Sequence, residues 1–163
     1  MTPAPASETC FLSSLPGKSV GQKVRFLGCV TDYDPIAGVL TLQHQYQPAA
    51  ASTSTSASTT PSGAIAPSLA GSVHARVNVD LVLERLTAEQ MTVGAWVNVM
   101  GYVTEAPEAA AAAIAGVANN RRRRAVPPTS ANIQAILLWS TGPLDVQAYE
   151  RQLSEMLSLK AGT

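Results

Sequence analysis

The sequence is poor in aromatic and in charged residues, which make up 5% and 13% of its 163 residues. Its charge-free stretches are rich in Ala, Ser and Thr rather than in Leu, Ile and Phe, so no segment predicts a membrane span. No basic residue precedes an apolar run at the N-terminus, so we expect no signal peptide. Cys10 and Cys29 are too few for a disulfide framework and are not at zinc-ligand spacing. These absences predict a protein of a reducing, intracellular compartment.

Charge of one sign is also lacking, since eleven basic residues balance eleven acidic ones. Four of the basic residues form one run, Arg121 to Arg124, and outside it the chain carries more acidic than basic residues. A domain that holds nucleic acid by its own electric field is basic along one face. We therefore expect no strong nucleic-acid binding by the domain alone. The arginine run is either a nuclear localisation or phosphate-binding signal or a solvated charge run, and the sequence does not decide between them.

What the sequence does have is 46% apolar residues, enough for the core of one domain. Three segments are too poor in large apolar residues to contribute to it: a flexible tail at 1–8 and low-complexity inserts at 48–71 and 106–131. The sequence therefore predicts a single domain over 9–160, interrupted by the two inserts.

Alternation of apolar and polar residues predicts five strands. They cover 23–33, 39–45, 73–83, 96–104 and 133–140. Gly28 in the first predicts a bulge or bend. In the third, alternation places every second residue from Val73 to Leu83 inward. The fifth is apolar on both faces, and we expect both to be covered.

Helical patterns complete the predicted architecture. Thr87 precedes helix-forming residues, which predicts a short helix over 87–91. Asp145 precedes an amphipathic helix extending to about Lys160. Five strands, a short helix between the third and the fourth, and a C-terminal α-helix are typical of an all-β, Greek-key OB-fold barrel.

Three sequence blocks carry a resemblance to a known family. They are GQKVRFLGCVTDYDPIAGVLTLQHQ, VNVDLVLERLTAEQMTVGAWVNVMGYV and IQAILLWSTGPLDVQAYERQL, at 21–45, 77–103 and 133–153. In this order they resemble the fungal Ten-one (Ten1) family, the smallest subunit of the CST telomere-capping complex. The resemblance covers nearly all of the predicted structured part and neither insert.

The resemblance implies a non-enzymatic OB-fold subunit, located in the nucleus at the telomeric region of chromosomes. It implies pairing with the N-terminal OB domain of the Stn-one (Stn1) subunit through the barrel wall and the C-terminal helix, in a complex with a third CST subunit. That complex binds single-stranded telomeric DNA, limits its degradation and helps DNA polymerase alpha–primase. An OB-fold adaptor of an unrelated nuclear complex is a further hypothesis.

No residue pattern predicts catalysis, a metal or a cofactor. Gly17-Lys18-Ser19 is similar to the end of a phosphate-binding loop, but Leu12 occupies the position of the required glycine. His44 and His74 lie on different predicted strands without other ligands at suitable spacing, so we expect both to be polar surface residues.

Nucleic-acid contact is predicted at Arg25, Arg76 and Tyr33, because OB folds hold single strands by stacking bases on aromatic rings above a basic groove. The alternative for both arginines is a solvated charge. Alternation places Leu27 on the same outward face. Two arginines and few rings predict weak binding to DNA alone and useful contact within a complex. A free-standing single-strand-binding OB protein is the alternative function.

Partner binding is predicted at the C-terminal helix, whose apolar stripe needs a surface to cover it. The stripe either packs on its own barrel or binds a second protein. Two further residues, from the fourth strand, project outward and are of types enriched at interfaces. The predicted partner-binding residues are Met100, Tyr102, Tyr149, Leu153, Met156 and Leu157.

Overall fold

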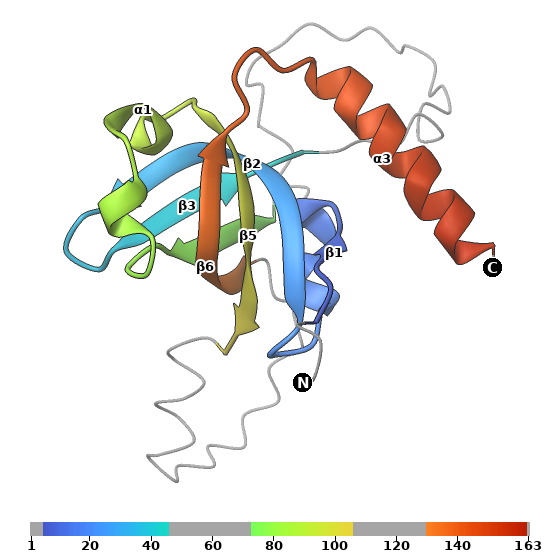
Figure 1. Ribbon diagram of the computed structural model, residues 1–163, viewed down its shortest axis with the longest axis horizontal. Helices are drawn as coiled ribbons and strands as arrows, with labels where there is room; N and C mark the ends of the chain where they lie inside the picture. The colour runs from blue at the N-terminus through green and yellow to red at the C-terminus, as the bar shows by residue number, and fades with distance from the viewer. Residues whose placement is uncertain (1–4, 46–72, 106–129, 163) are drawn as a thin grey trace, which may run out of the picture.

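The computed structural model describes residues 5–45, 73–105 and 130–162. Five strands form a closed barrel (Figure 1): β2 (Lys23–Asp34), β3 (Val39–Gln43), β4 (His74–Asn78), β5 (Trp96–Thr104) and β6 (Ser130–Ser140). The strand order is β2-β3-β4-β6-β5, and β2 also pairs with β5, which closes the barrel. The β4–β6 pairing is parallel and the other pairings in this ring are antiparallel. This is the five-stranded OB topology that the sequence predicted.

The turn between β2 and β3 follows directly from its residues. Asp34 Oδ1 accepts hydrogen bonds from the backbone N–H groups of Ile36 and Ala37, at 2.9 and 3.1 Å. Gly38 then adopts a φ of +61°, which glycine tolerates without strain. The irregularity expected at Gly28 lies further along, where the β2–β3 register shifts between Val30 and Asp32. Gly28 itself allows a close approach of β3, since a Cβ there would lie 2.9 Å from Leu42 Cβ.

The barrel interior is filled by apolar residues from all five strands. Phe26, Leu40, Val77, Val99 and Ile133 are examples, each at most 1% exposed. Two further leucines of this core, Leu12 and Leu15, come from a 3-10 helix that the sequence analysis missed, η1 (Leu12–Gly17).

The third strand is shorter than predicted and ends at Asn78. The Asn78 side chain accepts from the backbone N–H of Asp80 at 2.9 Å, which offers the backbone an alternative to strand pairing. A 3-10 turn follows, η3 (Leu83–Arg85). The prediction that Leu81 and Leu83 face inward is therefore wrong, since they are 71% and 46% exposed.

The short helix α1 (Ala88–Met91) forms where predicted. Its N-cap is Thr87, and the Gln90 side chain accepts from the Thr87 backbone N–H at 3.0 Å. The fifth strand begins at Ser130, three residues earlier than predicted, so the last two positions of the predicted 106–131 insert belong to β6. Its outer face is not fully covered, because Leu137 is 42% exposed. The remainder of that insert and the 48–71 insert lie outside the described residues.

The N-terminal segment joins the sheet before the barrel begins. Strand β1 (Glu8–Thr9) pairs in parallel with β2, placing Glu8 beside Val24 and Thr9 beside Arg25. Glu8, assigned to the flexible tail by the sequence analysis, is thus part of the fold.

The C-terminal helix α3 (Val146–Ala161) begins as predicted at Asp145, whose side chain accepts from the Ala148 N–H at 3.1 Å. It leaves the end of β6 and runs along the side of the barrel where β1 lies (Figure 1). No helix in the described part of the chain is long and apolar enough to cross a membrane.

Candidate docking surface

Helix α3 is attached to the barrel by few contacts. Leu153 is its only buried residue, at 4% exposure. One turn earlier, Glu150 Oε1 lies 2.8 Å from His44 Nε2, and the His44 side chain is 2% exposed. The rings of Phe11 and Trp96 lie 6.3 and 5.3 Å from the His44 ring. The prediction of a surface histidine at 44 is wrong, because α3 and the two rings cover it.

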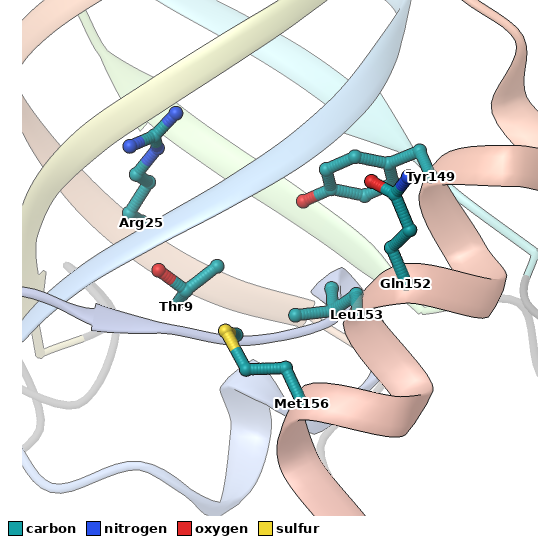
Figure 2. Close-up of a pocket in the computed structure, with 6 residues that line it drawn as sticks. All are labelled: Thr9, Arg25, Tyr149, Gln152, Leu153 and Met156. Atoms are coloured by element: carbon teal, nitrogen blue, oxygen red, sulfur yellow. The ribbon is translucent and has the colours of Figure 1, made fainter.

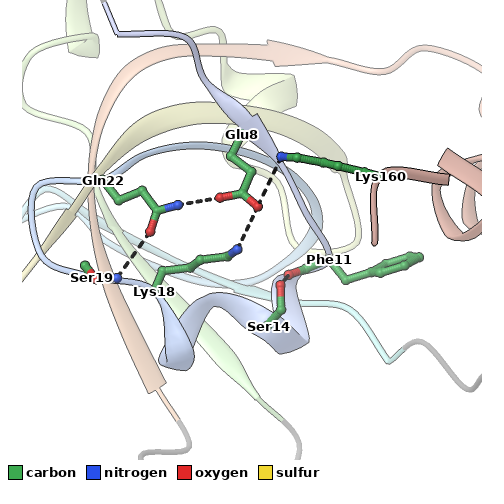
Figure 3. Close-up of polar contacts among 7 residues, drawn as sticks. All are labelled: Glu8, Phe11, Ser14, Lys18, Ser19, Gln22 and Lys160. Carbon is green, nitrogen blue, oxygen red and sulfur yellow. Dashed lines mark hydrogen bonds and ion pairs between the residues drawn. The ribbon is translucent and has the colours of Figure 1, made fainter. Parts of the chain in front are cut away.

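The far end of α3 is held by the N-terminal strand (Figure 3). Glu8 Oε1 lies 3.0 Å from Lys18 Nζ and 3.7 Å from Lys160 Nζ, and Gln22 donates a hydrogen bond to the same carboxylate. The hydrogen bond from Lys18 is the main cause that holds the pKa of Glu8 below its ordinary value. Glu8 therefore connects β1, the loop before β2 and the last turn of α3.

A pocket of about 250 Å³ lies between α3 and the adjoining edge of β1 and β2 (Figure 2). Its walls combine an arginine, two hydroxyl groups and apolar side chains. Burial raises the pKa of the Tyr149 hydroxyl, whereas the nearby charge of Arg25 acts in the opposite direction. The lining residues are Thr9, Arg25, Tyr149, Gln152, Leu153 and Met156.

The pocket is continuous with the outer wall of three strands. Arg25 pairs in register with Met100 of β5, and Met100 pairs with Leu137 of β6. Residues directly opposite each other share a face of the sheet. The Arg25 guanidinium carbon lies 5.1 Å from the ring centroid of Trp139, a cation–π arrangement. We call this surface the Arg25 face; it consists of Arg25, Met100, Leu137, Trp139, Tyr149 and Met156.

The structure brings three of the six predicted partner-binding residues to this surface: Met100, Tyr149 and Met156. Leu153 lies beneath it and is buried against the chain's own barrel. Tyr102 lies two positions from Met100, beside Lys23, and Leu157 is half-buried on α3. Leu137 and Trp139 were not predicted, because they stand in an apolar run that gives no sign of an open outer face.

The three predicted nucleic-acid contacts are not brought together. Arg76 is on β4, beside Thr41 and Asn132, and β3 separates it from β2 and Arg25. Tyr33 is half-buried and packs on the core. Leu27, expected to face solvent beside Arg25, is 1% exposed. Arg25 therefore belongs to the α3 side of the barrel and Arg76 to another wall.

Arg76 lines a second hollow, of about 290 Å³, with amide side chains around it. Asn78, Asn132 and Gln134 contribute these amides, and Glu105 adds a carboxylate. Within the described residues, no group of three His, Cys, Asp or Glu side chains is placed to hold a metal ion.

An OB barrel whose outer wall exposes apolar side chains beside a C-terminal helix with one buried residue is typical of a class, the OB-fold subunits that act by assembly. The family model for Ten1, described as telomere capping, CST complex subunit, matches residues 1–154. The chain belongs to the Ten1 family, whose members are non-catalytic subunits of the telomere-capping CST complex.

Two solved structures share the fold. The Stn1–Ten1 complex of S. pombe contains a chain with a TM-score of 0.57 and 17% identity, over 95% of each chain. The telomere capping protein Ten1 from Saccharomyces pombe gives a TM-score of 0.54 and 18% identity, over 94% of this chain and 99% of that chain. A comparison with curated protein sequences gives no match.

Proposed function

We propose that this protein is the Ten1 subunit of a CST complex and pairs with the N-terminal OB domain of Stn1 through the Arg25 face. The observation that carries this proposal is the exposed apolar surface that the outer wall and α3 form together. Leu137 and Met156 are 42% and 47% exposed there. Met, Trp, Tyr and Arg are the residue types enriched at protein interfaces. The related fold in the S. pombe Stn1–Ten1 complex supports the choice of partner.

In the assembled complex, together with the third CST subunit, the protein helps to bind and protect single-stranded telomeric DNA in the nucleus. It thereby supports the filling-in of the complementary strand by DNA polymerase alpha–primase. Direct DNA contact is a minor part of this role. The hollow around Arg76 offers one cation and several amides but also the Glu105 carboxylate, which suits only a weak contact to a single strand.

Co-expression with the N-terminal OB domain of Stn1 from the same organism tests the pairing. Size-exclusion chromatography with light scattering should give a stable one-to-one species. Leu137→Glu should weaken it by about thirtyfold or more, because it places an unpaired charge in a desolvated contact. The matched control is Ile36→Glu, since Ile36 is 98% exposed in the β2–β3 turn and away from α3. Two separate monomer peaks from the wild-type chains would refute the proposal.

A further inference from the structure

Arg25 lacks an acidic partner within the described residues. The ion pairs there join Lys18 and Lys160 to Glu8, and Glu150 is in hydrogen-bond contact with the His44 ring. Glu8 lies in β1, next to Thr9 of the pocket, and Glu150 lies in α3, next to Tyr149. Both carboxylates on the two sides of the pocket thus already have other partners, and Arg25 is left with the ring of Trp139.

The Trp139 ring also fixes where the guanidinium group lies. A cation above an indole ring is attracted by the electron-rich ring face, which restricts an otherwise flexible side chain. An arginine that is already ordered loses less conformational entropy when it binds, and its planar group can hold a carboxylate through two hydrogen bonds. Arg25 is therefore prepared for a ligand that carries a carboxylate.

The residues that line the pocket indicate the chemistry of the rest of that ligand. Leu153 and Met156 are apolar, while Thr9 and Tyr149 carry hydroxyl groups that can donate to an oxygen. Within the pocket lining, Arg25 is the only cation. A strand of nucleic acid is held by a track of several cations along its backbone. An acidic side chain next to an apolar one, on the surface of a protein, fits this pocket better than a phosphate backbone.

We propose that the pocket beneath α3 receives an Asp or Glu side chain of the partner protein, and that Arg25 is a specificity-determining contact of the protein interface rather than a DNA contact. The inference rests on the proposed pairing with Stn1 and adds the chemistry of one contact to it. Arg25 selects the partner by its charge, while Met100, Leu137 and Met156 supply apolar contact around it. This assignment replaces the prediction from sequence that Arg25 binds nucleic acid.

The affinity of the full chain for the N-terminal OB domain of Stn1 tests the inference, measured by isothermal titration calorimetry at low and at physiological salt. Arg25→Gln should weaken binding about tenfold and Arg25→Glu about a hundredfold. Arg25→Lys should restore part of the affinity, because it keeps the charge but not the two-pronged geometry. Arg85→Glu is the matched control, an exposed arginine in η3, and should change the affinity less than twofold.

A second measurement separates the two kinds of ligand. Fluorescence anisotropy with a telomeric single-stranded oligonucleotide should give the same affinity for the complexes formed by wild type and by Arg25→Gln. An Arg25→Gln protein that pairs normally with Stn1 but loses affinity for the oligonucleotide would overturn the inference in favour of a DNA contact. Equal pairing of wild type and Arg25→Glu would overturn it while leaving the proposed function intact. A wild-type chain that does not pair at all would refute both.

Discussion

Replacing Leu153 by alanine should release α3 while leaving the barrel folded. Leu153 is the only buried residue of the helix, so its side chain makes the largest apolar contribution to the attachment. Truncating a buried leucine to alanine costs about 2–5 kcal/mol. A cost of 2 kcal/mol alone raises the population of the detached state about thirtyfold. An isolated helix of this length is marginal in water, so the detached α3 should also unwind.

Hydrogen exchange followed by mass spectrometry measures this detachment directly. Amides of α3 in Leu153→Ala should exchange at least about thirtyfold faster than in wild type. Amides of β5 and β6 should keep their protection, because the barrel core does not include Leu153. Met156→Ala is the control: Met156 is 47% exposed, and its truncation should cost about 1 kcal/mol or less.

The alternative is that α3 and the barrel unfold as one cooperative unit. In that case Leu153→Ala would speed exchange in β5 and β6 by the same factor as in α3. That result would refute the view that α3 detaches from an independently stable barrel.

Three further changes follow from the packing. Glu8 has a lowered pKa, so its ion pairs stabilise the folded state at neutral pH and are lost as the pH falls through that pKa. Glu8→Gln should therefore reduce the drop in melting temperature on acidification. A pH profile identical to that of the wild type would contradict this. Gly101→Ala should lower the free energy of unfolding, measured in urea, by about 3 kcal/mol, because the new Cβ would collide with the backbone oxygen of Gln134. Gly17→Ala is the control and should be nearly neutral, because nothing lies near its Cβ. Cys10 is buried with a raised pKa and should resist a thiol reagent at pH 8 until the protein unfolds, so rapid labelling of the native chain at Cys10 would count against the described packing.

The barrel could be predicted from sequence wherever a local pattern decides the structure. The alternation in Lys23–Asp34, the turn chemistry after Asp34, and the caps at Thr87 and Asp145 each act over a few residues. Local patterns failed where a side chain offered the backbone another hydrogen bond. At Asn78 the run of alternating residues continues, but the side-chain bond to the Asp80 N–H ends the strand.

Features that depend on distant partners could not be predicted. His44 is buried because Glu150, 106 positions away, lies over it. Leu12 and Leu15 enter the core from a short segment without strand or helix periodicity, so nothing in their own sequence indicated it. The sequence around Arg25 does not distinguish a DNA contact from a protein contact. Only the fold shows that Arg25 lies beside α3 and Trp139. The sequence therefore predicts which residue types form the candidate site, but not which of these residues lie together.

The Glu8–Lys160 ion pair has a consequence for the engineering of this chain. It brings the side-chain ends of two residues that are 152 positions apart to within 3.7 Å, so the segments that contain Glu8 and Lys160 lie near each other. A linker that joins the segment of Glu8 to the segment of Lys160 would then permit circular permutation, with new ends opened in the exposed β2–β3 turn at Ile36. In such a permutant α3 would be an internal segment fixed at both ends. Its attachment to the barrel would be more stable, because the detached helix would have less conformational entropy. The residues of the Arg25 face would not change.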